Sequence, residues 1–228
     1  MIKIIPAILA KTYEEFESMV KKVEPYTDLV HLDIADGGFV SNKTIDGYEE
    51  LEKIDTKLNF EVHLMVNSPE TVISNWSRLS DNRGSSTKSG LESGSQKIIR
   101  FLIHWEAASD FDFLINEINI AGREVGCVFN PKTDYSVIEP YINRISLVQF
   151  MTVDPGFYGS LFLPEVLDKI RDFHIRYPGK QIQVDGGIKP ETLKLVESAG
   201  VDRAAVGSYI FQSDNLEKAL KELEASNV

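Results

Sequence analysis

The sequence is poor in cysteine and has no long apolar run. A single cysteine in 228 residues, Cys127, excludes a disulfide framework within the chain and fits a reducing cytoplasm. No apolar run approaches the ~20 residues of a membrane helix. The first six residues lack the basic and apolar regions of a signal peptide. We therefore expect a cytoplasmic protein with no membrane partner.

Positive charge is also scarce. The chain has 24 Lys and Arg against 35 Asp and Glu, which gives a net charge of -11. Phosphate backbones and anionic membranes attract basic patches, so we expect no nucleic-acid partner. A small phosphorylated substrate remains compatible with this charge, because it needs only a few local N–H donors.

Short apolar runs alternate with amphipathic segments along the whole chain. The periodicity predicts strands over 2–9, 29–34, 60–65, 98–104, 125–129, 145–151, 181–185 and 203–206. It predicts helices over 11–23, 48–54, 69–79, 111–121, 137–142, 164–176, 190–199 and 216–223, and a short turn opening at 207–208. Eight strand–helix units of this length predict an α/β fold, a closed (β/α)8 TIM barrel, as one domain over 1–228. The alternative, an open doubly wound sheet, would have a glycine-rich first turn, and residues 7–11 contain no glycine.

Composition changes abruptly over residues 80–97. This segment is rich in Ser, Gly and charge and has no helical or strand periodicity. We interpret it as a surface-loop insertion between a helix and a strand. A domain linker is the alternative, but the strand–helix alternation resumes unchanged beyond it.

Chemically capable side chains stand at the ends of several predicted strands, where a barrel of this type builds its active site. His31 and Asp33 are two positions apart and therefore point the same way, while His63 and Asp185 end other strands. Two imidazoles and two carboxylates suit a borderline divalent cation such as Zn, Fe(II), Mn or Co. We call these four residues the His–Asp cluster. The alternative is four separate residues, each hydrogen-bonded at its own strand end.

Small residues follow the sixth, seventh and eighth strands. Barrels often bind phosphate after strands seven and eight, and glycine lets the backbone approach an anion. The predicted phosphate-binding residues are Gly186, Gly187, Gly207 and Ser208. Gly156 and Gly159 are candidate hinges of a loop that closes over a ligand; an ordinary connecting loop is the alternative.

Five ordered motifs carry a family resemblance. They are His31-Leu32-Asp33-Ile34-Ala35-Asp36-Gly37-Gly38-Phe39-Val40, His63-Leu64-Met65, Met151-Thr152-Val153-Asp154-Pro155-Gly156-Phe157, Val184-Asp185-Gly186-Gly187-Ile188 and Gly207-Ser208. Their order and spacing resemble those of ribulose-phosphate 3-epimerases over nearly the whole chain, apart from 80–97. The resemblance implies a ribulose-phosphate-binding barrel that acts in carbohydrate metabolism, in the pentose phosphate pathway, as a homo-oligomer.

The resemblance also implies a reaction. The His–Asp cluster would bind one divalent metal that grips the C2 carbonyl and C3 hydroxyl of a ketose 5-phosphate. Asp33 and Asp185 would be the acid/base pair that inverts C3 of D-ribulose 5-phosphate, through an enediolate, to give D-xylulose 5-phosphate. Met65 and Met151 resemble the apolar cap around this intermediate. Core packing is the alternative explanation of both methionines.

Departures from the family pattern leave other functions open. Ala7 replaces a usual Ser, and Ala35 replaces a usual Met of the cap. Both changes would make room for a longer ketose phosphate such as allulose 6-phosphate. A non-catalytic sugar-phosphate-binding relative is another alternative, against which the intact cluster argues. A phosphate-binding decarboxylase would want a Lys beside Asp33, and none is there.

His104 and Glu106 also stand at a strand end. They are candidates for residues that orient a metal ligand, and a purely structural role explains them equally well. We therefore leave them outside the predicted site.

Overall fold

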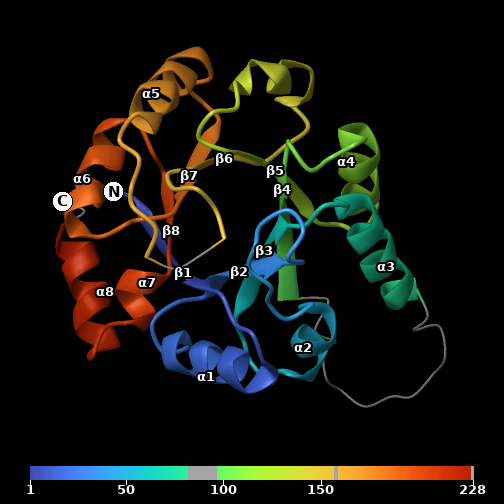
Figure 1. Ribbon diagram of the computed structural model, residues 1–228, viewed down its shortest axis with the longest axis horizontal. Helices are drawn as coiled ribbons and strands as arrows, with labels where there is room; N and C mark the ends of the chain where they lie inside the picture. Colours follow the sequence, from blue (N-terminus) through green and yellow to red (C-terminus); the bar gives the residue numbers. More distant parts are fainter. Residues whose placement is uncertain (82–96, 157–158, 227–228) are drawn as a thin grey trace.

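A computed structural model describes residues 1–81, 97–156 and 159–226. Its centre is a closed barrel of parallel strands, in which each strand pairs with the next and β8 pairs with β1 (Figure 1). The strands are β1 (Lys3–Ile8), β2 (Leu29–Ala35), β3 (Asn59–Met65), β4 (Ile98–His104), β5 (Glu124–Phe129), β6 (Leu147–Met151), β7 (Gln181–Asp185) and β8 (Arg203–Val206). The predicted TIM barrel is confirmed.

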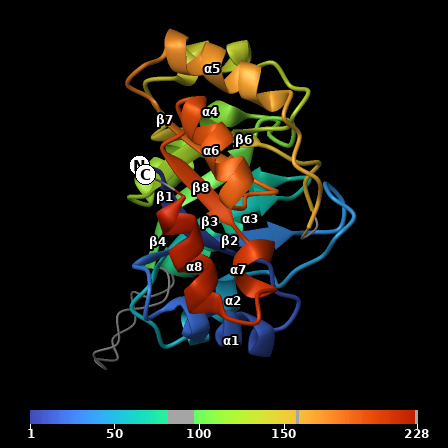
Figure 2. The same cartoon turned by 90° about the vertical axis from the view of Figure 1, so that its left-hand side faces the viewer.

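Helices surround the barrel and connect its strands, and Figure 2 shows α6 and α8 in front of them. The helices are α1 (Tyr13–Val23), α2 (Tyr48–Lys53), α3 (Pro69–Asp81), α4 (Phe111–Ile120), η2 (Tyr135–Tyr141), α5 (Val166–Arg176), α6 (Pro190–Ser198), α7 (Ser208–Phe211) and α8 (Leu216–Ala225). The segment η2, predicted as a short helix over 137–142, is a 3-10 helix with Pro140 inside it. Proline has no N–H for the α-helical ladder, which favours this shorter form.

Local sequence explains how a helix is placed against the barrel. Thr12 caps α1 by accepting a hydrogen bond from the Glu15 N–H. Phe16, Val20 and Val23 share one face of the helix and are buried. All seven residues of β2 are buried as well. This is expected for a parallel strand that has helices on one face and the barrel interior on the other.

The barrel interior is unusually polar. The main apolar core lies between the strands and the helices, whereas the inside of the barrel holds a smaller apolar cluster around Leu102, Val128 and Leu147. The buried polar side chains on the inward face of the strands include Glu61, Arg100, Gln149, Gln183 and Arg203. A charged layer therefore lies within the barrel, where bulky aliphatic side chains are usual.

The predicted insertion falls largely on residues 82–96, which lie outside the described residues. Helix α3 ends at Asp81 and β4 begins at Ile98, so both flanks stand at the edge where strands start. That edge is opposite the strand ends that build an active site. Within the described part of the chain, no helix is long and apolar enough to cross a membrane.

Candidate metal and substrate site

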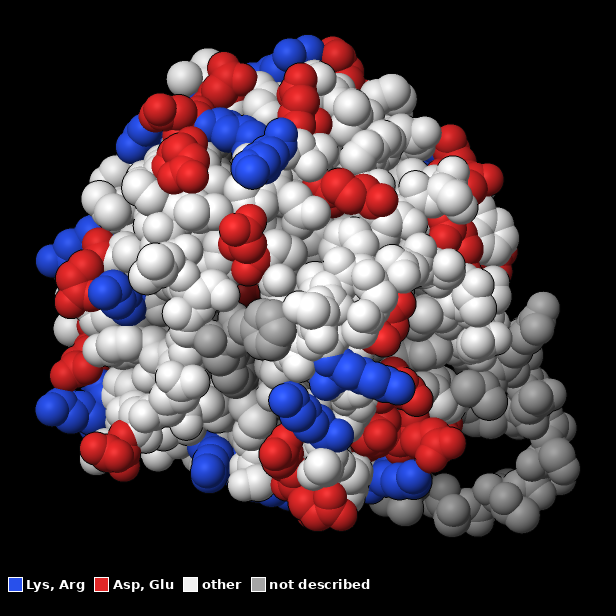
Figure 3. Space-filling model, viewed as in Figure 1, with Lys and Arg blue, Asp and Glu red and all other residues white. Residues whose placement is uncertain are grey.

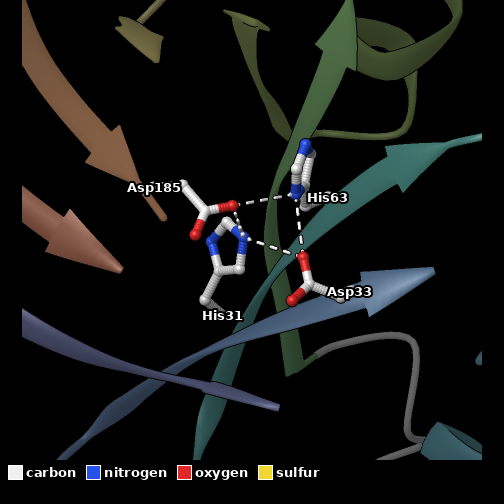
Figure 4. A group of neighbouring side chains, drawn as sticks. All are labelled: His31, Asp33, His63 and Asp185. Atoms are coloured by element: carbon white, nitrogen blue, oxygen red, sulfur yellow. Dashed lines mark hydrogen bonds and ion pairs between the residues drawn. The ribbon is translucent and has the colours of Figure 1, made fainter. Parts of the chain in front are cut away.

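Three strands deliver the His–Asp cluster to one point. His31 and Asp33 come from β2, His63 from β3 and Asp185 from β7, and Figure 4 shows the four side chains pointing toward one another. Strand register contributes directly, because Asp33 lies opposite His63 in the β2–β3 pair. The predicted residues are brought together, as expected for side chains at the ends of barrel strands.

The donor atoms of the cluster converge closely. One ligand atom from each residue lies within 4.8 Å of the others. His63 Nδ1 is 2.8 Å from Asp33 Oδ1 and 3.4 Å from Asp185 Oδ2. His31 Nε2 is 3.3 Å and 3.7 Å from the same two atoms. Two imidazole nitrogens and two carboxylate oxygens therefore surround one small volume.

This donor set fits a divalent cation. His31 Nε2 is fully buried and has no well-aligned hydrogen-bond partner among the described residues. Its other ring nitrogen, Nδ1, is 2.9 Å from Glu61 Oε1. A carboxylate on one ring nitrogen holds the proton there and leaves the other nitrogen free to bind a metal. Mixed nitrogen and oxygen donors suit zinc and neighbouring transition metals.

The two aspartates of the cluster have opposite electrostatics. Burial and the negative charge of Asp33 raise the pKa of Asp185 to about 6. Burial also opposes ionisation of Asp33, but the adjacent imidazoles of His31 and His63 outweigh it and hold the pKa of Asp33 well below its usual range. Two carboxyl groups whose pKa values are pushed apart are characteristic of an acid/base pair.

Glu61 supports His31 from within the barrel, and our sequence reasoning missed it. Glu61 is fully buried, and Arg100 Nη1 and Arg203 Nη2 each lie 3.0 Å from its Oε2. Burial would raise the pKa of Glu61, but His31 and the two arginines lower it to about 2. A signal was present, because Glu61 stands two residues before His63 and therefore shares its inward face.

His104 contacts the cluster from β4. Its Nε2 lies 2.9 Å from His63 Nε2, and its Nδ1 lies 3.4 Å from Glu106 Oε2. Burial is the main cause that lowers the pKa of His104 to about 4. The histidine is thus a neutral neighbour of a predicted metal ligand.

A cavity opens above the cluster. It is bordered by the predicted acid/base, phosphate-binding, hinge and cap residues, namely Asp33, Asp185, Gly186, Gly187, Gly207, Ser208, Gly156, Gly159, Met65 and Met151. His31 and His63 lie beneath its wall and are fully buried. On the face shown in Figure 3, acidic and basic side chains are interspersed, and uncharged residues separate them.

Glycine is required at the turn after β7. Gly186 and Gly187 have φ angles of 110° and 67°, which side chains other than glycine rarely adopt. A Cβ on Gly186 would lie 2.3 Å from Val153 Cγ2. Thr152 ties this turn to β6, since its hydroxyl donates to the Gly186 carbonyl at 2.6 Å. The backbone around Asp185 is therefore tightly held.

The two alanine departures have different surroundings. Ala7 lines the cavity, as expected of a residue that contacts substrate. Ala35 does not line the cavity; it packs with Val40, Met65 and Phe39 in a small apolar cluster. Because its neighbour Met65 does line the cavity, the expectation that Ala35 enlarges the pocket stays a prediction.

Comparisons with known proteins agree with this geometry. The model of the ribulose-phosphate 3 epimerase family matches residues 3–86 and 89–211. The ribulose-phosphate 3-epimerase of Schizosaccharomyces pombe is 31% identical over 98% of this chain and 93% of that protein. The Bacillus subtilis protein of the same name is 34% identical over 99% and 100%. A solved 3-hexulose-6-phosphate synthase from Salmonella typhimurium, 15% identical, covers 99% of this chain and 98% of its own with a TM-score of 0.66, which shows the shared fold.

Proposed function

Because the chain belongs to the ribulose-phosphate 3-epimerase family, we propose that it is an isomerase that interconverts D-ribulose 5-phosphate and D-xylulose 5-phosphate by inverting C3. The observation that carries this function is the pair of carboxylates, Asp33 and Asp185, with opposite pKa shifts at the base of one cavity. Two imidazoles within 4.8 Å complete the site.

The His–Asp cluster is the place where this chain would hold one divalent cation. Its nitrogen and oxygen donors are compatible with Zn, Fe(II), Mn or Co. Such an ion supplies Lewis-acid stabilisation of the negative charge that develops on the sugar oxygens, a contribution of several kcal/mol. The role of the protein is to hold the four donors in place from three strands.

Asp33 and Asp185 move the protons. One carboxylate removes the C3 proton and leaves a planar enediolate, and the other returns a proton to the opposite face. β2 and β7 carry these two residues and are separated around the barrel by β8 and β1. The two carboxyl groups therefore approach the cavity from different sides, as inversion requires.

The upper part of the cavity binds the phosphate and excludes water. No Lys or Arg lines the cavity within the described part of the chain, so backbone N–H groups of the turns after β7 and β8 and the Ser208 hydroxyl are the phosphate donors. Met65 and Met151 are buried and border the cavity near the cluster, where they keep water from the enediolate. Gly156 and Gly159 border it from the loop after β6.

Ala7 supports a second candidate substrate. Its small side chain lines the cavity, which favours activity on a longer ketose phosphate such as allulose 6-phosphate as well.

The family resemblance further supports one barrel domain over 1–228, a homo-oligomer and a place in the pentose phosphate pathway. The lone, buried Cys127 supports a cytoplasmic location.

Hydrogen exchange at C3 tests this function. The chain is stripped of metal with a chelator and incubated with D-ribulose 5-phosphate in D2O, with and without added Zn, Mn or Fe(II), and followed by NMR. We expect metal-dependent deuterium at C3 together with xylulose 5-phosphate. Absence of exchange with every metal, while allulose 6-phosphate exchanges, would favour the second substrate. Absence with both sugars would refute an epimerase.

A further inference from the structure

A buried histidine pair lies beside the cluster and is not accounted for by the acid/base chemistry. His104 is fully buried, and its ring is nearly parallel to that of His63, with 24° between the planes. The two Nε2 atoms are 2.9 Å apart, within hydrogen-bond distance. The Phe39 ring packs against His104, 4.7 Å away between centroids.

Proton positions in this pair are determined by the cluster. His63 Nδ1 faces the two aspartates, so as a metal ligand this nitrogen carries no proton. The neutral ring then has its proton on Nε2, which points at His104. Two N–H groups cannot face each other across 2.9 Å, so His104 Nε2 must be the acceptor. The His104 proton is thereby placed on Nδ1.

Glu106 receives that proton's hydrogen bond. Its Oε2 is 3.4 Å from His104 Nδ1. Its Oε1 accepts from the backbone N–H of Asn130 at 2.9 Å and from the Thr133 hydroxyl. Lys169 in turn donates to the carbonyls of that turn, including Asn130 O at 2.9 Å. The turn after β5 therefore fixes the orientation of this carboxylate, and Lys169 of α5 holds the turn in place.

From this geometry we infer that His104 is a positioning residue for the metal ligand His63, and that Glu106 selects the tautomer of His104 required for it. The inference rests on the proposed metal site. It also explains a difference between the two histidines of the cluster. The Nδ1 atom of His31 contacts the Glu61 carboxylate directly. The Nε2 atom of His63 contacts His104, which in turn contacts the Glu106 carboxylate. Neighbours of metal-bound histidines fix the orientation and basicity of the ligand.

Cobalt binding to the metal-stripped full-length chain tests the inference independently of activity. His104→Leu removes the acceptor, and His104→Gln restores one through its amide oxygen. We expect His104→Leu to bind Co2+ about 10-fold to 100-fold more weakly than the parent and to shift its visible absorption bands. His104→Gln should bind closer to the parent than to the Leu variant. The exposed His174 provides the matched control, because His174→Leu should leave affinity and spectrum unchanged.

The outcomes separate this inference from the proposed function. A parent chain that takes up no Co2+, or takes it up equally after His63→Ala, would overturn the metal site and the inference together. Binding that depends on His63 but is unchanged in affinity and spectrum by His104→Leu would overturn the inference alone. Equal losses for His104→Leu and His104→Gln would do the same. If His104→Leu does not fold, Glu106→Gln decides: weaker Co2+ binding supports the inference, and parental binding overturns it.

Discussion

At the residue scale, environment makes two identical side chains chemically different. Asp33 is buried, but His31 and His63 stand beside its carboxylate and lower its pKa, whereas burial beside the Asp33 charge raises the pKa of Asp185. Neither pKa shift follows from local sequence alone, because His63 stands beside Asp33 from another strand, and Asp33 stands beside Asp185 from another strand. The proposed acid/base chemistry would use this difference in pKa, and in the metal-free chain the difference lowers the stability of the fold.

The raised pKa of Asp185 predicts a stability cost in the metal-free chain. A carboxyl whose folded pKa is about 6, against 3.8 for the ordinary group, destabilises the fold when ionised. The full cost, about 3 kcal/mol, applies above pH 6 and disappears as the pH falls toward the ordinary value. Asp185→Asn should therefore be more stable than the metal-free parent at about pH 8. Urea unfolding measures this free energy.

The pH dependence and added metal provide the controls for that prediction. Near pH 4.5 the advantage of Asp185→Asn should shrink to roughly a third of its value at high pH. Saturating Zn2+ should stabilise the parent more than the variant, because the parent offers the complete donor set. An equal or lower stability of the variant at high pH without metal would contradict the account.

The four residues of the His–Asp cluster could be predicted from the sequence, but the buried charged residues that hold them could not. Polar residues at strand ends identify His31, Asp33, His63 and Asp185, since the barrel brings those ends together. Glu61 lies mid-strand in an apolar run, and its arginine partners are 39 and 142 residues away in sequence. Only the closed barrel makes these residues neighbours, so the local pattern indicates the inward direction of Glu61 but not its arginine partners.

At the element scale, the inward face of β3 contributes residues to the charged layer, to the His–Asp cluster and to the cavity wall. Its alternate residues are Glu61 in the charged layer, His63 in the cluster and Met65 at the cavity wall. Strand alternation alone orders these three along the barrel axis. The charged layer thus lies directly beneath the predicted metal ligands, and its Glu61 contacts His31.

Removal of the Glu61 charge predicts a large loss of stability. Glu61→Gln leaves Arg100 and Arg203 inside the barrel without their shared anion. Breaking one partner of a buried ion pair costs about 3–5 kcal/mol. The matched control is Glu124→Gln, which removes the exposed second partner of Arg100 and should cost no more than about 1 kcal/mol. Similar unfolding free energies for the two variants would argue against a structural role for the charged layer.

Element boundaries followed closely from periodicity and capping residues. The strand 98–104 and the start of a helix at Pro69 agree with the structure, because turn and cap signals are local. Two short elements differ. Pro140 converts a predicted helix into the 3-10 segment η2, and the predicted turn at 207–208 opens the four-residue helix α7. Such short segments are decided by packing rather than by periodicity.

At the scale of the whole molecule, the predicted site and the predicted insertion lie at opposite edges of the barrel. The His–Asp cluster and the cavity occupy the edge where strands end, while α3 and β4 meet the 82–96 segment at the opposite edge. Barrels of this type separate function from stability in this way. The family match skips only residues 87 and 88 of this segment, and the order of the strands continues unchanged beyond it.

Because the segment and the site lie at opposite edges, we expect the protein to tolerate a deletion within the segment. Removal of residues 84–94 should leave turnover and metal affinity unchanged, since the described flanks lie at the edge away from the site. The measurement compares kcat/KM and Co2+ affinity of the shortened and full chains, with circular dichroism to establish folding. A folded but inactive short chain would show that the segment contributes to the site.

The central claim is that the protein is an epimerase in which two carboxylates act on opposite faces of the substrate. The most direct test follows proton exchange at C3 of each epimer separately. Asp33→Asn and Asp185→Asn, loaded with metal and checked for metal content, are incubated in D2O with ribulose 5-phosphate and with xylulose 5-phosphate. The account predicts that each variant loses interconversion by about 10²-fold to 10⁴-fold. It also predicts that any residual deuterium enters only one epimer, a different one for each variant. Full interconversion by either metal-loaded variant would contradict the account.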